Sequence, residues 1–276
     1  MSLITRRRFS TLLGLVAVNG TLKQLHGQDH NETGHSAPKE EAKTAAPAAA
    51  PKPVVPPTAP AAAAKSPAAS SLVNRATAAP EVIWADLMAG NKRFVTGKTA
   101  PRDVIRGRVD TAKAQHPYVM VLCCSDSRLS PELIFDQNIG DLFVVRTAGN
   151  VADPIALASL EYAVEHLGSR MLVVLGHENC GAVSAALSGE AMPSENLTAL
   201  VKKIRPAVER LKDLVTGDAL MTLAVEANVH HSTANALENS AILRHGVAAG
   251  ELTVVKALYK LGTGEVSALN KIYESV

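Results

Sequence analysis

The sequence has few aromatic residues, few cysteines and little net charge. Phe, Trp and Tyr make up 3% of the 276 residues, and a net charge of +2 gives no electrostatic signal for binding nucleic acid. If two of the three cysteines bind a metal, only one remains, and no disulfide framework can form. The apolar run near the N-terminus is far shorter than the roughly 20 residues of a membrane-spanning helix, so no transmembrane span is expected.

The first 79 residues differ from the rest of the chain in composition. Within residues 1–27, the run Arg6-Arg7-Arg8 precedes a short apolar run at 12–18, a pattern that resembles a twin-arginine export signal. It predicts a periplasmic or otherwise extracytoplasmic protein, with a disordered basic tail on a cytoplasmic protein as the alternative. Residues 28–79 are polar and then rich in Ala and Pro, which predicts a disordered linker. A folded domain is expected over residues 80–276.

Strand and helix patterns alternate along this domain. Apolar runs predict strands, and helical spacing of apolar residues predicts the helices between them. The predicted strands are 115–122, 142–146, 171–175 and 221–225, followed by a hairpin-like edge over 253–261 and 266–269. The longer predicted helices are 81–98, 155–167, 197–215 and 229–245, the third kinked or split at Pro206. The alternation predicts an α/β fold: an open, mostly parallel β-sheet of order 2-1-3-4 with an edge strand, flanked by helices.

Chemically reactive side chains follow two of these strands. Cys124 ends the first strand, and His177 and Cys180 follow the third. Two thiols and an imidazole can give zinc three protein ligands and leave a fourth position open, as in catalytic zinc sites. If the two strands are neighbours, their carboxyl ends bring these side chains together at the point where the winding of the sheet reverses. The alternative is that the cysteines are small apolar core residues.

Cys123 is the neighbour of a predicted ligand but receives a different role. Successive side chains of a strand point to opposite faces, so Cys123 is expected to pack in the core while Cys124 binds the metal. For the same reason a redox role for the Cys123–Cys124 pair is disfavoured.

Four motifs together resemble those of the β-class carbonic anhydrases. They are CSDSR at 124–128, GHENCG at 176–181, GNKRF at 90–94 and DLFVVRTAGN at 141–150, and the resemblance covers roughly residues 82–273. It implies a catalytic domain for zinc-dependent, reversible hydration of carbon dioxide to bicarbonate and a proton by zinc-bound hydroxide. It also implies one Zn²⁺ per chain, held by Cys124, His177 and Cys180, and a homodimer or a dimer of dimers.

The resemblance implies roles for five further residues. Asp126 would accept the proton of bound hydroxide and orient it, Arg128 would hold Asp126 by a bidentate pair, and in a closed state Asp126 would become a fourth zinc ligand. The alternative for this pair is an ordinary loop salt bridge. The expected substrate pocket consists of Gln115, Phe143 and Tyr162, partly across a dimer interface. Their alternatives are a polar residue at a strand start and two core aromatics.

One departure from the family pattern concerns regulation. Members with a bicarbonate-controlled switch tend to carry Trp three residues before the first cysteine ligand, where this sequence has Val121. We therefore expect a site that is open near neutral pH. Two other functions stay open from the sequence: hydrolysis of carbonyl sulfide or carbon disulfide on the same scaffold, and a non-catalytic zinc-binding role.

Overall fold

The computed structural model describes residues 77–269. The predicted export segment and all but the last three residues of the predicted linker lie outside this range, so these two assignments stay predictions. The first helix, α1, begins at Pro80. Within residues 77–269, no helix combines the length and apolar character needed to cross a bilayer.

Five strands form one sheet in the order β2-β1-β3-β4-β5. The first four strands of this order are parallel, and β5 pairs antiparallel with β4. This confirms the predicted order, the mostly parallel pairing and the terminal hairpin. The strands are β1 (Val119–Cys124), β2 (Leu142–Thr147), β3 (Met171–His177), β4 (Thr253–Tyr259) and β5 (Val266–Ala268).

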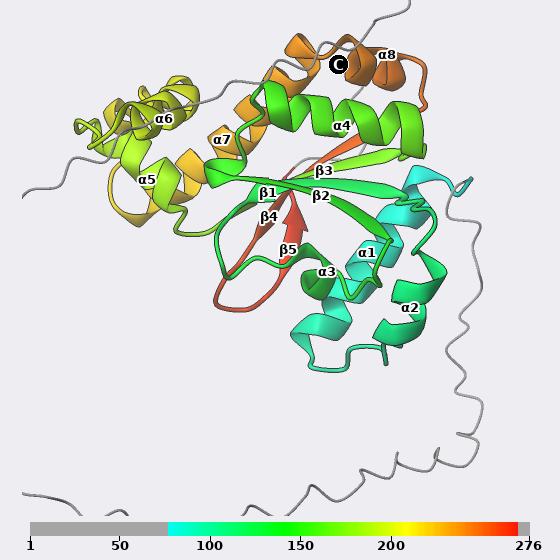
Figure 1. Cartoon of the computed structure of the whole chain (residues 1–276). Coiled ribbons are helices and arrows are strands. Elements are labelled where there is room, and N and C mark those ends of the chain that lie inside the picture. The colour runs from blue at the N-terminus through cyan, green and yellow to red at the C-terminus, as the bar shows by residue number, and fades with distance from the viewer. Residues whose placement is uncertain (1–76, 270–276) are drawn as a thin grey trace, which may run out of the picture. The chain divides into compact units, whose positions relative to one another are not determined.

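Helices cover both faces of the sheet (Figure 1). The strands β1 and β3 are buried along their whole length, and alternate residues enter two different cores. Val121 and Val173 pack with residues of α1 and α3, whereas Leu122 and Val174 pack with residues of α4 and α8. The helices are α1 (Pro80–Val95), α2 (Val104–Asp110), α3 (Pro131–Ile134), α4 (Pro154–Leu167), α5 (Gly181–Ser188), α6 (Glu195–Val208), α7 (Asp218–Asn239) and α8 (Ala241–Ala248).

The predicted strand at 221–225 is wrong, because these residues belong to α7. A five-residue apolar run fits a buried strand and a buried helix equally well. The buried residues of this segment recur at helical spacing, and neither Gly nor Pro occurs between residues 218 and 239 to stop the helix. The fourth strand of the sheet is instead β4, which the sequence analysis assigned to the terminal hairpin. The predicted helix over 197–215 is shorter than expected, because α6 ends at Val208, just after Pro206.

The helix α4 illustrates how local sequence fixes an element. The Asp153 carboxylate accepts the backbone N–H groups of Ile155 and Ala156, and Pro154 occupies the first turn, where its missing N–H is not needed. The helix ends at Gly168, whose φ of 71° is the left-handed conformation that glycine adopts without strain.

The strand order places the ligand strands at the switch point of the sheet. From β1 the chain passes to β2 on one side, and it then returns past β1 to β3 on the other side. Where the connections from two neighbouring parallel strands run in opposite directions, a crevice forms at the carboxyl ends of the strands. Cys124 ends β1 and His177 ends β3, so both lie at this crevice.

Candidate metal and active site

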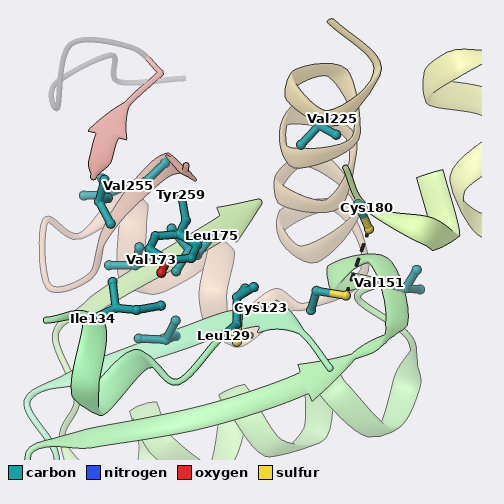
Figure 2. Close-up of a cluster of buried hydrophobic side chains, with 14 of the residues drawn as sticks. Cys123, Leu129, Ile134, Val151, Val173, Leu175, Cys180, Val225, Val255 and Tyr259 are labelled. Atoms are coloured by element: carbon teal, nitrogen blue, oxygen red, sulfur yellow. Dashed lines mark hydrogen bonds between the residues drawn. The ribbon is translucent and has the colours of Figure 1, made fainter. Parts of the chain in front are cut away.

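Cys124, His177 and Cys180 form a buried cluster at the carboxyl ends of β1 and β3. Their potential ligand atoms all lie within 4.8 Å of one another. The two sulfurs are 4.0 Å apart, a contact that Figure 2 marks as a dashed line reaching Cys180. Cys123 lies beside Leu129 in the same figure, away from that line, and belongs to the core. The cluster therefore contains two of the three thiols and one imidazole.

The imidazole of His177 presents one nitrogen without a protein partner. Its Nδ1 is 2.8 Å from the carbonyl oxygen of Glu178, to which an Nδ1–H donates. This contact leaves the lone pair on Nε2, which is buried and has no hydrogen-bond partner among the described residues. A buried, partner-free nitrogen costs stability unless a ligand satisfies it. A metal ion between Nε2 and the two thiols would do so.

The two thiols respond oppositely to their mutual contact. The contact with Cys180 and, less strongly, the backbone N–H of Gly149 lower the pKa of Cys124 to about 4. The same bond to Cys124, together with burial, raises the pKa of Cys180. A thiolate is thus favoured at Cys124, and a divalent cation binds cysteine in its deprotonated form. Two Zn–S bonds of about 2.3 Å at a tetrahedral angle place sulfurs roughly 3.8 Å apart, so the observed spacing fits zinc.

Backbone contacts fix the turn that carries His177 and Cys180. The N–H of Glu178 donates to the carbonyl of Tyr259 at 3.1 Å, and the Glu178 carboxylate accepts the N–H of Leu261 at 3.0 Å. These bonds tie the turn to the end of β4. Before the turn, a Cβ on Gly176 would lie 2.4 Å from the Val229 side chain, so only glycine lets α7 pack this close to β3.

Side-chain contacts fix the loop that carries Cys124 and Asp126. Arg146, near the end of β2, donates from Nε to the Cys124 carbonyl at 3.2 Å and from Nη2 to the Asp126 carbonyl at 2.7 Å. The N–H of Gly149 lies 3.3 Å from Cys124 Sγ. Neither Arg146 nor Gly149 is among the residues predicted for the site, although both lie in the DLFVVRTAGN motif.

Asp126 and Arg128 form a bidentate ion pair beside the cluster. Arg128 donates from Nε to Oδ1 at 2.9 Å and from Nη2 to Oδ2 at 2.7 Å, and its backbone N–H also reaches Oδ1. These bonds hold the pKa of Asp126 well below its usual range, so the carboxylate is ionised. Its Oδ2 lies 4.0 Å from His177 Nε2. An acceptor oxygen therefore stands next to the place where a metal would bind.

Gln115, Phe143 and Tyr162 do not join this cluster in one chain. Gln115 is exposed and precedes β1, whereas Cys124 ends that strand, and six strand residues span roughly 20 Å. Phe143 pairs with Met120 near the start of β1, and its ring lies 6.5 Å from that of Tyr162 on α4. The Tyr162 side chain is half exposed. These three residues line the amino half of the sheet and the outer side of β2.

Comparisons with known proteins identify similar chains. A family model described as carbonic anhydrase matches residues 119–266. Carbonic anhydrase 2 of Mycobacterium tuberculosis is 37% identical over 189 residues, which cover 67% of this chain and 90% of that protein. The carbonic anhydrase of Mycolicibacterium smegmatis is 38% identical over 192 residues, 68% of this chain and 92% of that protein. The β-carbonic anhydrase CafA of Aspergillus fumigatus is similar in structure, with a TM-score of 0.56 and 27% identity over 70% of this chain and 93% of that one.

Proposed function

This chain belongs to the β-carbonic anhydrases and catalyses the reversible hydration of carbon dioxide, and we propose that Cys124, His177 and Cys180 hold the one zinc ion per chain on which this reaction depends. The observation that carries the proposal is the buried, partner-free Nε2 of His177 beside two cysteine sulfurs that lie 4.0 Å apart. Because the relatives are carbonic anhydrases, neither the hydrolysis of carbonyl sulfide or carbon disulfide nor a purely structural zinc site is favoured.

Cys124, His177 and Cys180 would hold the zinc, which would supply an activated water as the nucleophile for carbon dioxide. The ionised Asp126 would accept a hydrogen bond from this water. Oδ1 already accepts two bonds from Arg128, whereas Oδ2 accepts one and is the oxygen nearer to His177, so Oδ2 is the acceptor. Arg128 keeps the carboxylate charged and fixes the plane in which Oδ2 points. As an acceptor, Asp126 admits a water but not a bare anion.

The same ion pair supports an open site near neutral pH. With both carboxylate oxygens bonded to Arg128, Asp126 would have to break two charged hydrogen bonds before it could bind the metal as a fourth ligand. The site is then accessible without a separate activating step.

A second copy of the chain would complete the substrate pocket. The outer edge of β2 pairs with no strand of the described chain, and a groove of about 340 Å³ runs along it from Phe143 to Ser159 on α4. Gln115, Phe143 and Tyr162 lie too far from the Cys124 of their own chain to act there. A homodimer formed along this edge would bring one chain's pocket residues to the other chain's metal ligands, and two dimers could pair further.

Complementation between inactive variants tests this arrangement. If Gln115 acts across the interface, a one-to-one mixture of Gln115→Ala and Asp126→Ala chains forms mixed dimers that contain one intact site. Random exchange then restores about a quarter of the wild-type rate. If the mixture shows only the average of the two parents, Gln115 does not act in the partner's site.

We also propose that the chain acts outside the cytoplasm, because the Arg6-Arg7-Arg8 pattern resembles a twin-arginine signal. Replacing Arg6 and Arg7 with Lys should retain the protein in the cytoplasmic fraction of cells. Unchanged distribution between fractions would contradict this route.

The central experiment measures carbon dioxide hydration by stopped flow on the full chain, with zinc quantified in the same sample. We expect rapid hydration between pH 6 and 9, about one zinc per chain and loss of both after chelation. Full zinc content without hydration in that range would contradict the assigned mechanism.

A further inference from the structure

The Gly149 peptide contacts a predicted zinc ligand from outside the ligand set. Its N–H points to Cys124 Sγ at 3.3 Å. Gly149 has a φ of 68° and a ψ of 25°, a left-handed conformation inside the short 3-10 turn Ala148–Asn150. A Cβ at this position would lie 2.6 Å from Ile204, so the peptide fits tightly between α6 and β1. The direction of this N–H depends on how firmly the backbone of Gly149 is held on both sides of its Cα.

One side chain of α7 holds that residue from its other side. The Asn228 Nδ2 donates to the Gly149 carbonyl at 2.8 Å and lies 3.4 Å from Asn150 Oδ1. One helical turn further along α7, Ser232 Oγ accepts the Asn150 amide at 3.3 Å. Two residues of one helix face thus bind two consecutive residues, Gly149 and Asn150, of the turn after β2.

The helix that carries Asn228 is itself rigidly placed. Val229, the next residue along the helix, packs against the glycine of β3 that precedes His177, where no side chain would fit. Asn228 is 1% exposed, and its Oδ1 has no hydrogen-bond partner among the described residues. Burying an amide with half of its capacity unused costs free energy, and an apolar residue of similar volume would avoid that cost. If Asn228 served only to fill space, an apolar side chain of similar volume would stabilise the fold more.

We propose that Asn228 is a positioning residue for the zinc ligand Cys124, which acts by fixing the Gly149 N–H in its hydrogen bond to the Sγ atom. This inference rests on the proposed function of Cys124 as a zinc ligand. A hydrogen bond to a ligating thiolate withdraws electron density from the sulfur and fixes its direction. In a site with two thiolates, less charge then reaches the metal, and the metal remains a better Lewis acid.

Two variants of the full chain test the role of Asn228. Asn228→Leu keeps the volume and removes the donor, and Asn228→Asp keeps the shape but directs a carboxylate at the Gly149 carbonyl. The matched control is Ser232→Ala, which removes a hydroxyl from the same helix face but does not touch Gly149. Each protein is prepared with zinc and, separately, with cobalt(II) in its place.

The readouts are the thiolate-to-cobalt charge-transfer band, the rate of zinc release to a chelator, and the kcat and KM of hydration. We expect the Asn228 variants to shift the band, to release zinc faster and to lose about 10-fold or more in kcat/KM, as is usual when a hydrogen-bond partner of a metal ligand is removed. Ser232→Ala should leave the band in place and fall short of the roughly 10-fold effects on zinc release and kcat/KM, because Ser232 contacts Asn150 and not Gly149.

A folded Asn228 variant with wild-type band position, zinc release and hydration would overturn the proposal, even if its melting temperature were lower. Asn228→Asp serves this purpose if Asn228→Leu does not fold. Failure of the proposed function is distinguishable, because then the wild-type chain would itself show no zinc or no hydration.

Discussion

The two loops that build the site follow equivalent strands but are made differently. Both β1 and β3 are fully buried parallel strands, and each ends at a proposed zinc ligand. The loop after β3 contributes His177 and Cys180, which are 0% and 1% exposed. The loop after β1 contributes one ligand and then turns outward, so the side chains of Asp126 and Arg128 are 17% and 54% exposed. In the proposed function, the buried side chains after β3 bind the metal, and the more exposed Asp126 and Arg128 after β1 orient the water.

The two loops also differ in what holds them. The His177–Cys180 turn is tied by backbone groups at the end of β4, and α5 begins directly after Cys180. The Cys124–Arg128 loop is tied by two hydrogen bonds from the Arg146 side chain in addition to the Ser125 N–H, which donates to the Thr147 carbonyl. Substitution of Arg146 can therefore loosen the loop after β1 without breaking a backbone bond of the sheet.

The largest effect is expected in the loop after β3, at Cys180. Cys180→Ser keeps the shape of the side chain but replaces a thiolate with a hydroxyl, a far weaker zinc ligand at neutral pH. Zinc affinity should fall by more than the roughly 100-fold that changes to a ligand's hydrogen-bond partners cost. Zinc content after dialysis and hydration should both fall to background. A variant that retains full zinc and hydration would remove Cys180 from the ligand set.

A smaller effect, on hydration but not on zinc binding, is expected in the loop after β1. Asp126→Asn keeps the volume of the side chain but removes its charge and one acceptor, so zinc should stay bound while hydration falls by roughly 10²–10⁴-fold. Arg128→Gln should act in the same direction through Asp126. Retained activity in zinc-loaded Asp126→Asn would mean that the pair is only a loop salt bridge, worth about 0–1 kcal/mol.

The pH dependence of the Asp126–Arg128 pair follows from the direction in which the pKa of Asp126 is shifted. Arg128 holds the pKa of Asp126 below its ordinary value of 3.8, so the carboxylate stays ionised at every pH above that value. The stabilisation by the pair is fully present above the unfolded pKa and is lost only as the pH falls through the lower, folded one. Any loss of hydration between pH 8 and 6 should therefore have the same midpoint in Arg128→Lys as in the wild type, a point that stopped-flow profiles can check.

The strand ends that form the site could be predicted from local sequence. Apolar runs before Cys124 and His177 identify two buried strands, and the parallel α/β pattern then places their ends together. The apolar run at 221–225 led to a wrong strand prediction, because five apolar residues fit a buried helix such as α7 as well as a buried strand. Local pattern could not resolve that case, and only the packing of the whole chain did.

The contacts that tune the site could not be predicted in this way. Asn228 reaches Gly149 across 79 residues of sequence, and no short motif records such a bond. Arg146 was visible inside a family motif, but its role depends on the register that places β2 beside β1. The positions of Gln115 and Tyr162 away from the ligands likewise follow from strand direction, which residue identity alone does not give.

The smallest effect is expected at Cys123, which adjoins a proposed ligand in sequence but is fully buried in the core. Burial raises the pKa of its thiol to about 12, so at pH 8 only about one molecule in 10⁴ carries the reactive thiolate. Brief treatment of the folded protein with iodoacetamide should leave Cys123 unmodified, with or without zinc, whereas chelation should expose Cys124 to alkylation. Fragmentation of the peptide that contains both residues distinguishes the two by tandem mass spectrometry, with the urea-unfolded chain as the control in which all three cysteines react. Alkylation of Cys123 in the folded, zinc-loaded protein would mean that β1 opens as readily as the loop after it, and the contrast between a rigid sheet and a loosely tied catalytic loop would then fail.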